Sequence, residues 1–280
     1  MTTLLLPIAG HSSRFPNLNP KWSLTHPLGD MMVVEAVKGL DLANVERICF
    51  IGLEEHDQRF QLVAALTPQL ESLGLLDKTE FVLLQERTSS QPESIARGIR
   101  QAGVTGPIYV KDSDNYFRDT PDDTNCVAGY DLHQLERVNA RSKSYVEVND
   151  DGLIINIVEK QIISSRFCVG GYSFQDADQF LEYYDRDAAS GLELYVSGII
   201  FAMILDGAAF SSRTVSDYVD WGTVKEWQAY RNQFTTLFVD LDGVLVLNSG
   251  QFTEPKWGTT DSIEENVAVL NRLHETGKVH

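Results

Sequence analysis

The sequence has few cysteines, few basic residues and no long apolar run. Its three cysteines, Cys49, Cys126 and Cys168, have no CxxC spacing, which supports neither a disulfide framework nor a zinc site. No apolar stretch approaches the ~20 residues that span a bilayer, and MTTLLLPIAG at the N-terminus has neither a basic region nor a long apolar core. We therefore expect a cytoplasmic protein without a membrane partner.

The deficit of basic residues also narrows the range of partners. The chain has 23 Lys and Arg against 40 Asp and Glu, which gives a formal net charge of -17. A nucleic-acid partner is excluded by this balance, because binding to phosphate backbones needs a basic face. If the protein handles phosphates, it must do so with a few local cations or a bound metal ion.

Short apolar runs alternate with helix-like segments from the start of the chain. Strands are expected at residues 3–8, 46–53, 80–86 and 107–114, and helices at residues 31–40, 57–74 and 92–103. This alternation predicts an α/β fold with a mixed, mostly parallel central sheet and helices on both faces. Strand-like pieces follow at residues 125–132, 143–160 and 166–174, with NDDG at 149–152 as a hairpin signal, and then helices at residues 176–190, 195–207 and 224–234.

The loop after the first expected strand, PIAGHSSRFPNLNPKWSL, has the composition of a phosphate-binding loop. It lies at the carboxyl edge of the sheet, where free backbone N–H groups can cradle phosphate oxygens. Gly10 permits close backbone approach, and Arg14 and Lys21 supply local positive charge. The spacing is neither GxGxxG nor GxxxxGK[ST], which counts against an NAD site or a P-loop.

Two aspartates end the expected strand PIYVKDSD at the same edge. Asp112 and Asp114 stand two residues apart, so their side chains should tend to one side. Carboxylates in such a place are hard oxygen ligands suited to Mg²⁺.

These segments together resemble the sugar-phosphate nucleotidyltransferases, the pyrophosphorylase-like branch of the GT-A fold. LPIAGHSSRF followed by NPKWSL is similar to the family's signature loop, and the similarity recurs in order through SSQPESIARGI, KDSDNYF, VEK, VGGYSF and DYVDWGT. It covers Leu4 to about Tyr230. The resemblance implies a GT-A or Rossmann-like fold and a magnesium-dependent enzyme that joins an NTP to a phosphorylated acceptor and releases pyrophosphate.

The resemblance also implies the site residues. It assigns catalytic phosphate contacts to Arg14, Lys21 and Lys160, and Mg²⁺ ligation to Asp114 and Asp220, with Asp112 as a third candidate. Nucleotide binding falls on Ala9, Gly10, His11, Ser12, Ser13, Gln85, Gln91, Glu93 and Ser94, among which the amides of Gln85 and Gln91 suit base recognition. Acceptor binding falls on Gly170, Gly171, Tyr172 and Ser197.

This sequence departs from the family pattern at three places. Ser12 stands where the family usually has its second glycine, Gln161 stands where proline is frequent after Lys160, and YVSGII lacks an acidic residue near Gly198. The nucleotide is therefore left open among CTP, UTP, GTP and dTTP, and the acceptor among hexose or heptose 1-phosphates and a non-sugar phosphate such as phosphocholine. A homodimer is compatible with the sequence, which does not specify one.

A second motif, DLDGVL, follows an apolar run near the end of the chain. It resembles the first motif of haloacid-dehalogenase-type phosphatases, in which the residues matching Asp240 and Asp242 act as nucleophile and as general acid and base. The partner motifs of that family are not found downstream. We expect a nucleotidyltransferase domain at residues 1–235 and an incomplete phosphatase-like βα segment at residues 236–280, with a strand at 235–242 and a helix at 262–278, belonging to a longer bifunctional polypeptide.

The sequence thus predicts a nucleotidyltransferase that makes an activated precursor for surface or capsule polysaccharide. Two alternatives stay open at this point: phosphatase activity through Asp240 and Asp242, and a non-catalytic module that binds a nucleotide or a sugar phosphate.

Overall fold

The computed structural model describes residues 1–10, 12, 14–15, 18–135, 140–189, 193–247 and 260–279. The chain divides into two compact units, Met1–Val224 and Lys225–His280, and each is described by itself. No helix in the described ranges is long and apolar enough to cross a membrane. The boundary predicted at residue 235 stays a prediction.

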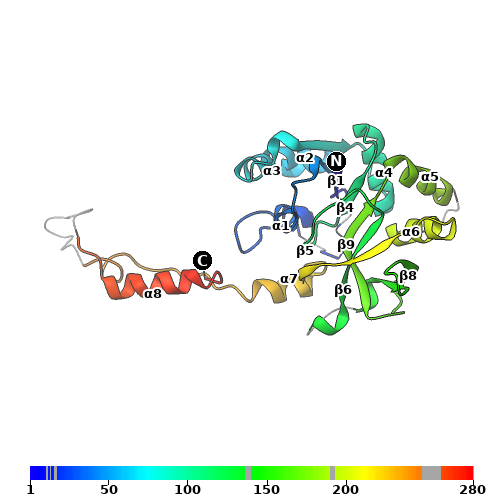
Figure 1. Cartoon of the computed structure of the whole chain (residues 1–280). Coiled ribbons are helices and arrows are strands. Elements are labelled where there is room, and N and C mark those ends of the chain that lie inside the picture. The colour runs from blue at the N-terminus through cyan, green and yellow to red at the C-terminus, as the bar shows by residue number, and fades with distance from the viewer. Residues whose placement is uncertain are drawn as a thin grey trace. The chain divides into compact units, whose positions relative to one another are not determined.

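The first unit is built on a nine-stranded mixed sheet (Figure 1). Its main path runs in the order β10-β6-β9-β4-β1-β2-β3, and β7 extends it by pairing with both β8 and β9. The strands are β1 (Thr2–Pro7), β2 (Val45–Leu53), β3 (Thr79–Leu84), β4 (Ile108–Lys111), β6 (Cys126–Asp131), β7 (Ser144–Val148), β8 (Ile154–Glu159), β9 (Arg166–Phe174) and β10 (Ser211–Thr214). β3, β2, β1 and β4 are parallel neighbours, whereas β9 runs antiparallel to β4 and β6. The expected α/β architecture is confirmed.

Helices cover both faces of this sheet because its central strands are apolar on both sides. In β1, Leu5 belongs to one buried cluster with residues of α4, α5 and α6, whereas Leu4 and Leu6 belong to a second cluster with residues of α1 and α3. Figure 1 shows α4, α5 and α6 on one side of β4 and β9 and α1 on the other. The helices of this unit are α1 (Met32–Lys38), α2 (Glu54–Phe60), α3 (Leu62–Ser72), α4 (Gln91–Ala102), α5 (Ala177–Ala188) and α6 (Val196–Leu205), with the short 3₁₀ helices η1 (Lys21–Ser23), η2 (Leu76–Lys78), η3 (Leu132–Gln134) and η4 (Ala140–Ser142).

One expected helix is divided in the structure. The segment predicted as a single helix at 57–74 forms α2 and α3, because Gln61 between them has a left-handed backbone with φ 52° and ψ 49°. The Asp57 carboxylate accepts the Val63 N–H at 2.9 Å and so satisfies a donor in the first turn of α3. The helical periodicity of the sequence continues across Gln61, so the pattern alone could not reveal the break between α2 and α3.

A second, two-stranded sheet brings two distant segments together. β5 (Asn115–Arg118) pairs antiparallel with β11 (Ser216–Asp220), and Asp220 lies opposite Asn115. The start of β5, which follows β4, and the end of β11, which follows β10, therefore lie side by side.

The second unit differs from the sequence prediction. Within residues 225–247 and 260–279 it contains the part of α7 (Val224–Arg231) beyond Val224 and α8 (Glu264–Glu275), but the strand expected at 235–242 is not formed there. Only isolated bridges occur, such as Thr235 with Val279 and Asp242 with Val246. An apolar run needs a partner strand to satisfy its backbone groups, and this prediction was wrong because the described residues of the unit offer none.

Candidate active site

A cavity of about 590 Å³ opens where the segments after β1, β3 and β4 converge. Its walls are completed by the start of β7, the end of β8, β9, the start of α6 and the end of β11. Thirteen of the predicted site residues line it: Gly10, Ser12, Arg14, Lys21, Gln91, Ser94, Asp112, Asp114, Lys160, Gly170, Tyr172, Ser197 and Asp220. Residues up to about 200 positions apart in the chain are thus brought to one place.

Four predicted residues do not line this cavity. Ala9 is buried, and Gln85 is exposed. Glu93 instead accepts hydrogen bonds from Ser89 at the start of α4 and pairs with Arg97. Gly171 faces the other side of β9, where a Cβ would meet Tyr109 Oη at 2.4 Å. His11 and Ser13, also predicted to bind nucleotide, lie outside the described residues.

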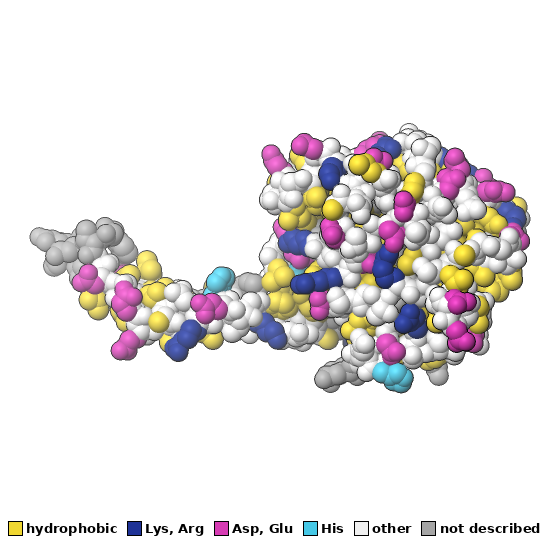
Figure 2. Space-filling model, viewed as in Figure 1, with side chains coloured by type: hydrophobic (Ala, Val, Ile, Leu, Met, Phe, Trp, Pro, Cys, Tyr) yellow, Lys and Arg dark blue, Asp and Glu magenta, His cyan; other side chains and the backbone are white. Residues whose placement is uncertain are grey.

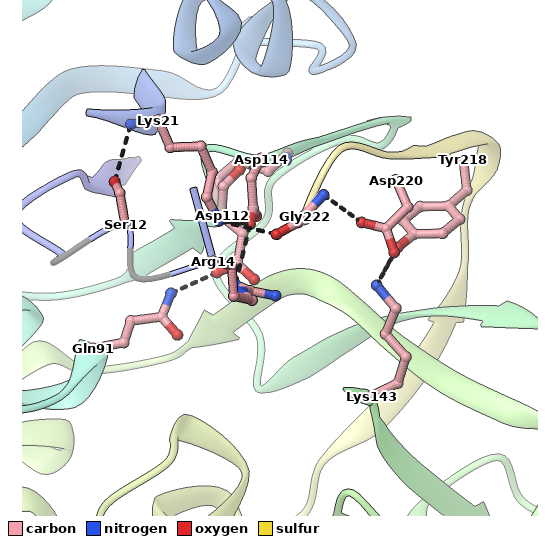
Figure 3. Close-up of polar contacts among 11 residues, drawn as sticks. Ser12, Arg14, Lys21, Gln91, Asp112, Asp114, Lys143, Tyr218, Asp220 and Gly222 are labelled. Carbon is pink, nitrogen blue, oxygen red and sulfur yellow. Dashed lines mark hydrogen bonds and ion pairs between the residues drawn. The ribbon is translucent and has the colours of Figure 1, made fainter. Parts of the chain in front are cut away.

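Ser12 fixes the position of the lysine that follows in the loop. Its backbone is left-handed, with φ 49°, a conformation that is costly for residues other than glycine. Its Oγ accepts the Lys21 N–H at 3.0 Å, at the start of η1 (Figure 3). The hydroxyl that distinguishes this loop from a glycine-containing one therefore holds the backbone of Lys21.

Two cations from the loop after β1, Arg14 and Lys21, contact the Asp114 carboxylate. Lys21 Nζ lies 2.6 Å and Arg14 Nη2 3.4 Å from Asp114 Oδ2. Burial raises the pKa of Asp114, but the charges of Lys21 and Arg14 outweigh burial and hold that pKa below its usual range. The Trp221 N–H donates to the Asp114 carbonyl at 2.9 Å, which ties this segment to the end of β11.

Asp220 has its own lysine partner. Lys143 Nζ forms an ion pair with Asp220 Oδ2 and donates to Tyr218 Oη at 2.8 Å, and the two paired side chains are only 14% and 16% exposed. The Gly222 N–H donates to Asp220 Oδ1 at 2.9 Å (Figure 3). A Cβ at Gly222 would lie 2.9 Å from Asp220 Oδ1 and 3.5 Å from Asp114 Oδ2, so both carboxylates approach one point.

Asp112 lines the same cavity as Asp114 but lies beside α4, with partners of its own. Gln91 Nε2 donates to Asp112 Oδ1, and Gly170, with φ +83°, leaves room for the carboxylate, because a Cβ there would lie 2.3 Å from Asp112 Oδ2. Burial, followed by the nearby negative charge of Asp114, raises the pKa of Asp112 to about 6. Asp112 and Asp114 line one cavity but take different partners, because β4 ends at Lys111 and its alternation does not continue.

Lys111 lies beneath these carboxylates as a fully buried cation. Its Nζ donates to the Asp112 carbonyl at 2.7 Å and to the carbonyl and side chain of Asn115. Burial lowers its pKa to about 7, against the opposing effect of the neighbouring aspartates. Lys111 fixes the turn that carries Asp112 and Asp114.

The open end of the β7–β8 hairpin forms the opposite wall. Ser144 pairs with Glu159, and the Lys160 N–H donates to the Lys143 carbonyl at 2.9 Å, so the two lysines are neighbours. Lys160 has a left-handed backbone, with φ 58°, and its Nζ donates to Tyr195 Oη at 2.6 Å.

Sequence reasoning missed Lys143, Tyr218 and Lys111 among the polar residues of this site. A usable signal existed for Lys143: counting outward from the NDDG turn places it opposite the VEK segment. Tyr218 reaches the site because β11 pairs with β5, and Lys111 contributes because it is buried beneath the aspartates. No local sequence pattern shows either feature.

The carboxylates present are compatible with Mg²⁺. Asp114 and Asp220 are hard oxygen ligands from two segments that approach one point, and Mg²⁺ is commonly held by one or two carboxylates together with substrate phosphates and water. Among the described residues, no group of three His, Cys, Asp or Glu side chains forms a complete protein cage for a metal ion. Any Mg²⁺ here would take its further ligands from substrate phosphates or water.

Comparisons of the chain with known proteins show its fold. No family model matches, and no curated protein matches. Solved structures do: a nucleoside-diphosphate-sugar pyrophosphorylase from Vibrio cholerae RC9 has a TM-score of 0.68 and 19% identity over 82% of this chain and 100% of that one. An inositol-1-phosphate CTP transferase from T. maritima has a TM-score of 0.62 and 13% identity, over 82% of this chain and 93% of that one. A UTP-bound UGPase from Acinetobacter baumannii has a TM-score of 0.59 and 15% identity, over 82% and 92%. The chain therefore shares the fold of these three structures.

Proposed function

We propose that this chain is a nucleotidyltransferase that transfers NMP from an NTP to a phosphorylated acceptor and releases pyrophosphate. The observation that carries the proposal is the arrangement of Arg14, Lys21 and Lys143 around Asp114 and Asp220 in one cavity at the carboxyl edge of the sheet. Cations and carboxylates gathered in one cavity suit a reaction between phosphates, in which catalysis is mainly positioning and charge neutralisation.

The chain's own residues supply binding and orientation. An acceptor phosphate oxygen attacks the α-phosphorus of the NTP in line, and no covalent intermediate on the protein is needed. Arg14, whose side chain is 55% exposed, is able to move onto the departing β- and γ-phosphates, whereas Lys21 is 11% exposed and is fixed against Asp114. Lys143 and Lys160, neighbours at the hairpin end, face the acceptor phosphate from the other wall. When bound by Asp114 and Asp220, Mg²⁺ would neutralise phosphate charge.

The nucleotide base is assigned to the neutral end of the cavity. The segment Thr88–Gln91 and Ser94 bring hydroxyl and amide groups to the cavity, whose lining also includes Pro7 and Ile8. Thr88 Oγ1 and Ser94 Oγ lie 2.6 Å apart. A base has a flat apolar face and polar edges, which fit such a wall. The nucleotide stays open among CTP, UTP, GTP and dTTP.

Pyrophosphate release tests the proposal directly. Each of the four NTPs is combined with a panel of sugar 1-phosphates, phosphocholine and phosphoethanolamine in the presence of Mg²⁺. We expect release with at least one pair, and we expect Asp114→Asn to abolish it. The matched control is Asp217→Asn, on the same β11 as Asp220 but outside the cavity and 57% exposed, which should keep full activity. Nucleotide binding without release from any pair would show a binding module instead.

We also propose a cellular role and a domain division that follow from the sequence motifs. The product would be an activated precursor for surface polysaccharide, and residues 236–280 would be a segment separate from the transferase. Support for the division comes from the exposure of its apolar side chains: Leu237, Phe238, Val239 and Leu241 are 39%, 95%, 40% and 52% exposed. Asp240 is also exposed, and its carboxylate accepts the Leu241 N–H. No feature of the described residues favours phosphatase activity for it.

A further inference from the structure

Glu159 at the end of β8 lines the cavity. Its Oε2 accepts hydrogen bonds from both Ser144 Oγ and Ser197 Oγ, the latter at 2.9 Å. Ser144 and Ser197 are 7% and 3% exposed, and all three residues line the cavity. The two buried hydroxyls fix the direction of the carboxylate.

Glu159 differs from Asp114 and Asp220 in its ion pairing. Asp114 is paired with Lys21 and Asp220 with Lys143. In the part of the chain that the structure describes, no lysine, arginine or histidine forms an ion pair with Glu159, and Lys160 Nζ next to it is bonded to Tyr195 Oη instead. Glu159 is half-buried in the cavity, so a cationic ligand that enters there could form an ion pair with it.

The hydrogen-bonding character of this wall points to the kind of ligand. Both serine protons are already donated to Glu159, so the lone pairs of Ser144, Ser197 and Glu159 Oε1 are all acceptors. A protonated primary amine has three donors and no acceptor, and it matches such a wall in charge and in hydrogen bonding. A hydroxyl would gain no charge pairing there. A quaternary ammonium group has no N–H to donate and prefers an aromatic face, but the Tyr195 ring already holds Lys160 Nζ at 4.4 Å from its centroid.

We propose that the acceptor of this transferase is a phosphate ester that carries a protonated primary amine, and that Glu159 selects it through this amine. The phosphate would meet Lys143 and Lys160, the residues next to Ser144 and Glu159 across the hairpin end, so amine and phosphate are only a few bonds apart in the acceptor. Phosphorylated amino alcohols and 2-amino sugar 1-phosphates have this spacing. The inference rests on the proposed function and narrows its acceptor.

Two matched acceptor pairs test it: phosphoethanolamine against 2-hydroxyethyl phosphate, and glucosamine 1-phosphate against glucose 1-phosphate. Calorimetric titration of each compound into the protein measures affinity, and pyrophosphate release with each NTP measures kcat/KM. We expect the amine of at least one pair to bind at least tenfold more tightly than its alcohol. Glu159→Gln, which keeps an oxygen acceptor for both serines, should bring this ratio close to one. The control Glu147→Gln, at an exposed position of β7 in the same hairpin and outside the cavity, should keep the ratio.

The titrations separate this inference from the proposed function. Amine selectivity that is lost in Glu159→Gln, with no pyrophosphate release from any pair, would support the inference about the ligand and refute the transferase. Release with an acceptor whose amine gives no advantage would leave the transferase standing and overturn the role of Glu159. Equal weakening of amine and alcohol in Glu159→Gln would also overturn it, because it would show a purely structural role.

Discussion

Replacing Lys21 by methionine tests the ion pair at the centre of the cavity. Lys21 Nζ and Asp114 Oδ2 lie 2.6 Å apart, and the two side chains are 11% and 15% exposed. Removing one partner of a buried pair costs about 3–5 kcal/mol, because the other charge stays buried without compensation. Arg14, 3.4 Å away but 55% exposed, compensates in part. We therefore expect Lys21→Met to lower the free energy of unfolding at pH 7 by about 3 kcal/mol, at the low end of that range.

The pH dependence gives this prediction a second, independent measurement. In the native protein the pKa of Asp114 lies below its usual range, so the stability from this group is present above the unfolded-state pKa and is lost as the pH falls through the folded one. In Lys21→Met we expect burial to outweigh the remaining charges of Arg14 and Lys143 and to raise that pKa above the unfolded-state value. In the variant, Asp114 then takes up a proton at acid pH, and the cost of its buried, unpaired charge disappears. The difference between the two proteins should therefore shrink as the pH falls from 7 toward about 4.

The assay is equilibrium unfolding in urea with a metal chelator present. Trp22 and Trp221 are 2% and 1% exposed and lie beside the pair, so tryptophan fluorescence reports on this region. Lys21→Met combined with Asp114→Asn should recover about 2 kcal/mol, because the buried charge is then removed. The reasoning is refuted by a loss below about 1 kcal/mol at pH 7, or by a loss that stays constant on acidification.

Three further predictions concern other parts of the chain. Lys160→Gly should be more stable than Lys160→Ala by about 1 kcal/mol, because only glycine relieves the left-handed backbone at φ 58°, whereas both variants should show the same rise in acceptor KM. For His26, burial and the nearby charge of Lys38 lower the pKa to about 4, below its unfolded-state value near 6.5, so stability should fall as the pH drops between these values, by up to about 3 kcal/mol. His26→Asn, which keeps an acceptor for the Leu28 N–H, should remove this acid-sensitive part from pH-dependent thermal melts; an unchanged slope would contradict it. Asp240→Asn should leave pyrophosphate release unchanged, and a loss of release would mean that the segment at 236–280 takes part in the transferase reaction.

The sequence predicted the fold well where apolar periodicity and β-strand pairing agree. β1, β2, β3 and β4 were found close to their expected positions because each is a short apolar run that pairs with at least one neighbouring strand. The run at 235–242 has the same local pattern but forms no strand, since pairing and not composition decides that outcome. The break at Gln61 shows the same limit for helices, because one backbone conformation interrupts a continuous pattern.

For the site, the motifs identified residues on separate segments but not their partners. Asp114 and Lys21 were both expected to contact phosphates or metal, and the structure adds that they contact each other. Lys143 was missed because its position beside Lys160 follows from the pairing of β7 with β8 and not from its own segment, RSKSY. Ser12 was identified as a departure from the family's second glycine, and the structure adds that its hydroxyl accepts the Lys21 N–H. The roles of all these residues in binding and turnover stay predictions.

The acidic surface of the molecule has a consequence for the kinetics of substrate capture. Figure 2 shows Asp and Glu side chains spread over the visible face of the Met1–Val224 unit, and the whole chain has a formal net charge of -17. At a distance, such a protein repels a polyanionic nucleotide, and only close to the cavity do Arg14, Lys21 and Lys143 attract it. Dissolved salt screens the distant repulsion more than the short-range attraction, since the Debye length is about 10 Å at 0.1 M. Moderate ionic strength should therefore speed nucleotide association, the reverse of the usual behaviour of electrostatically steered enzymes.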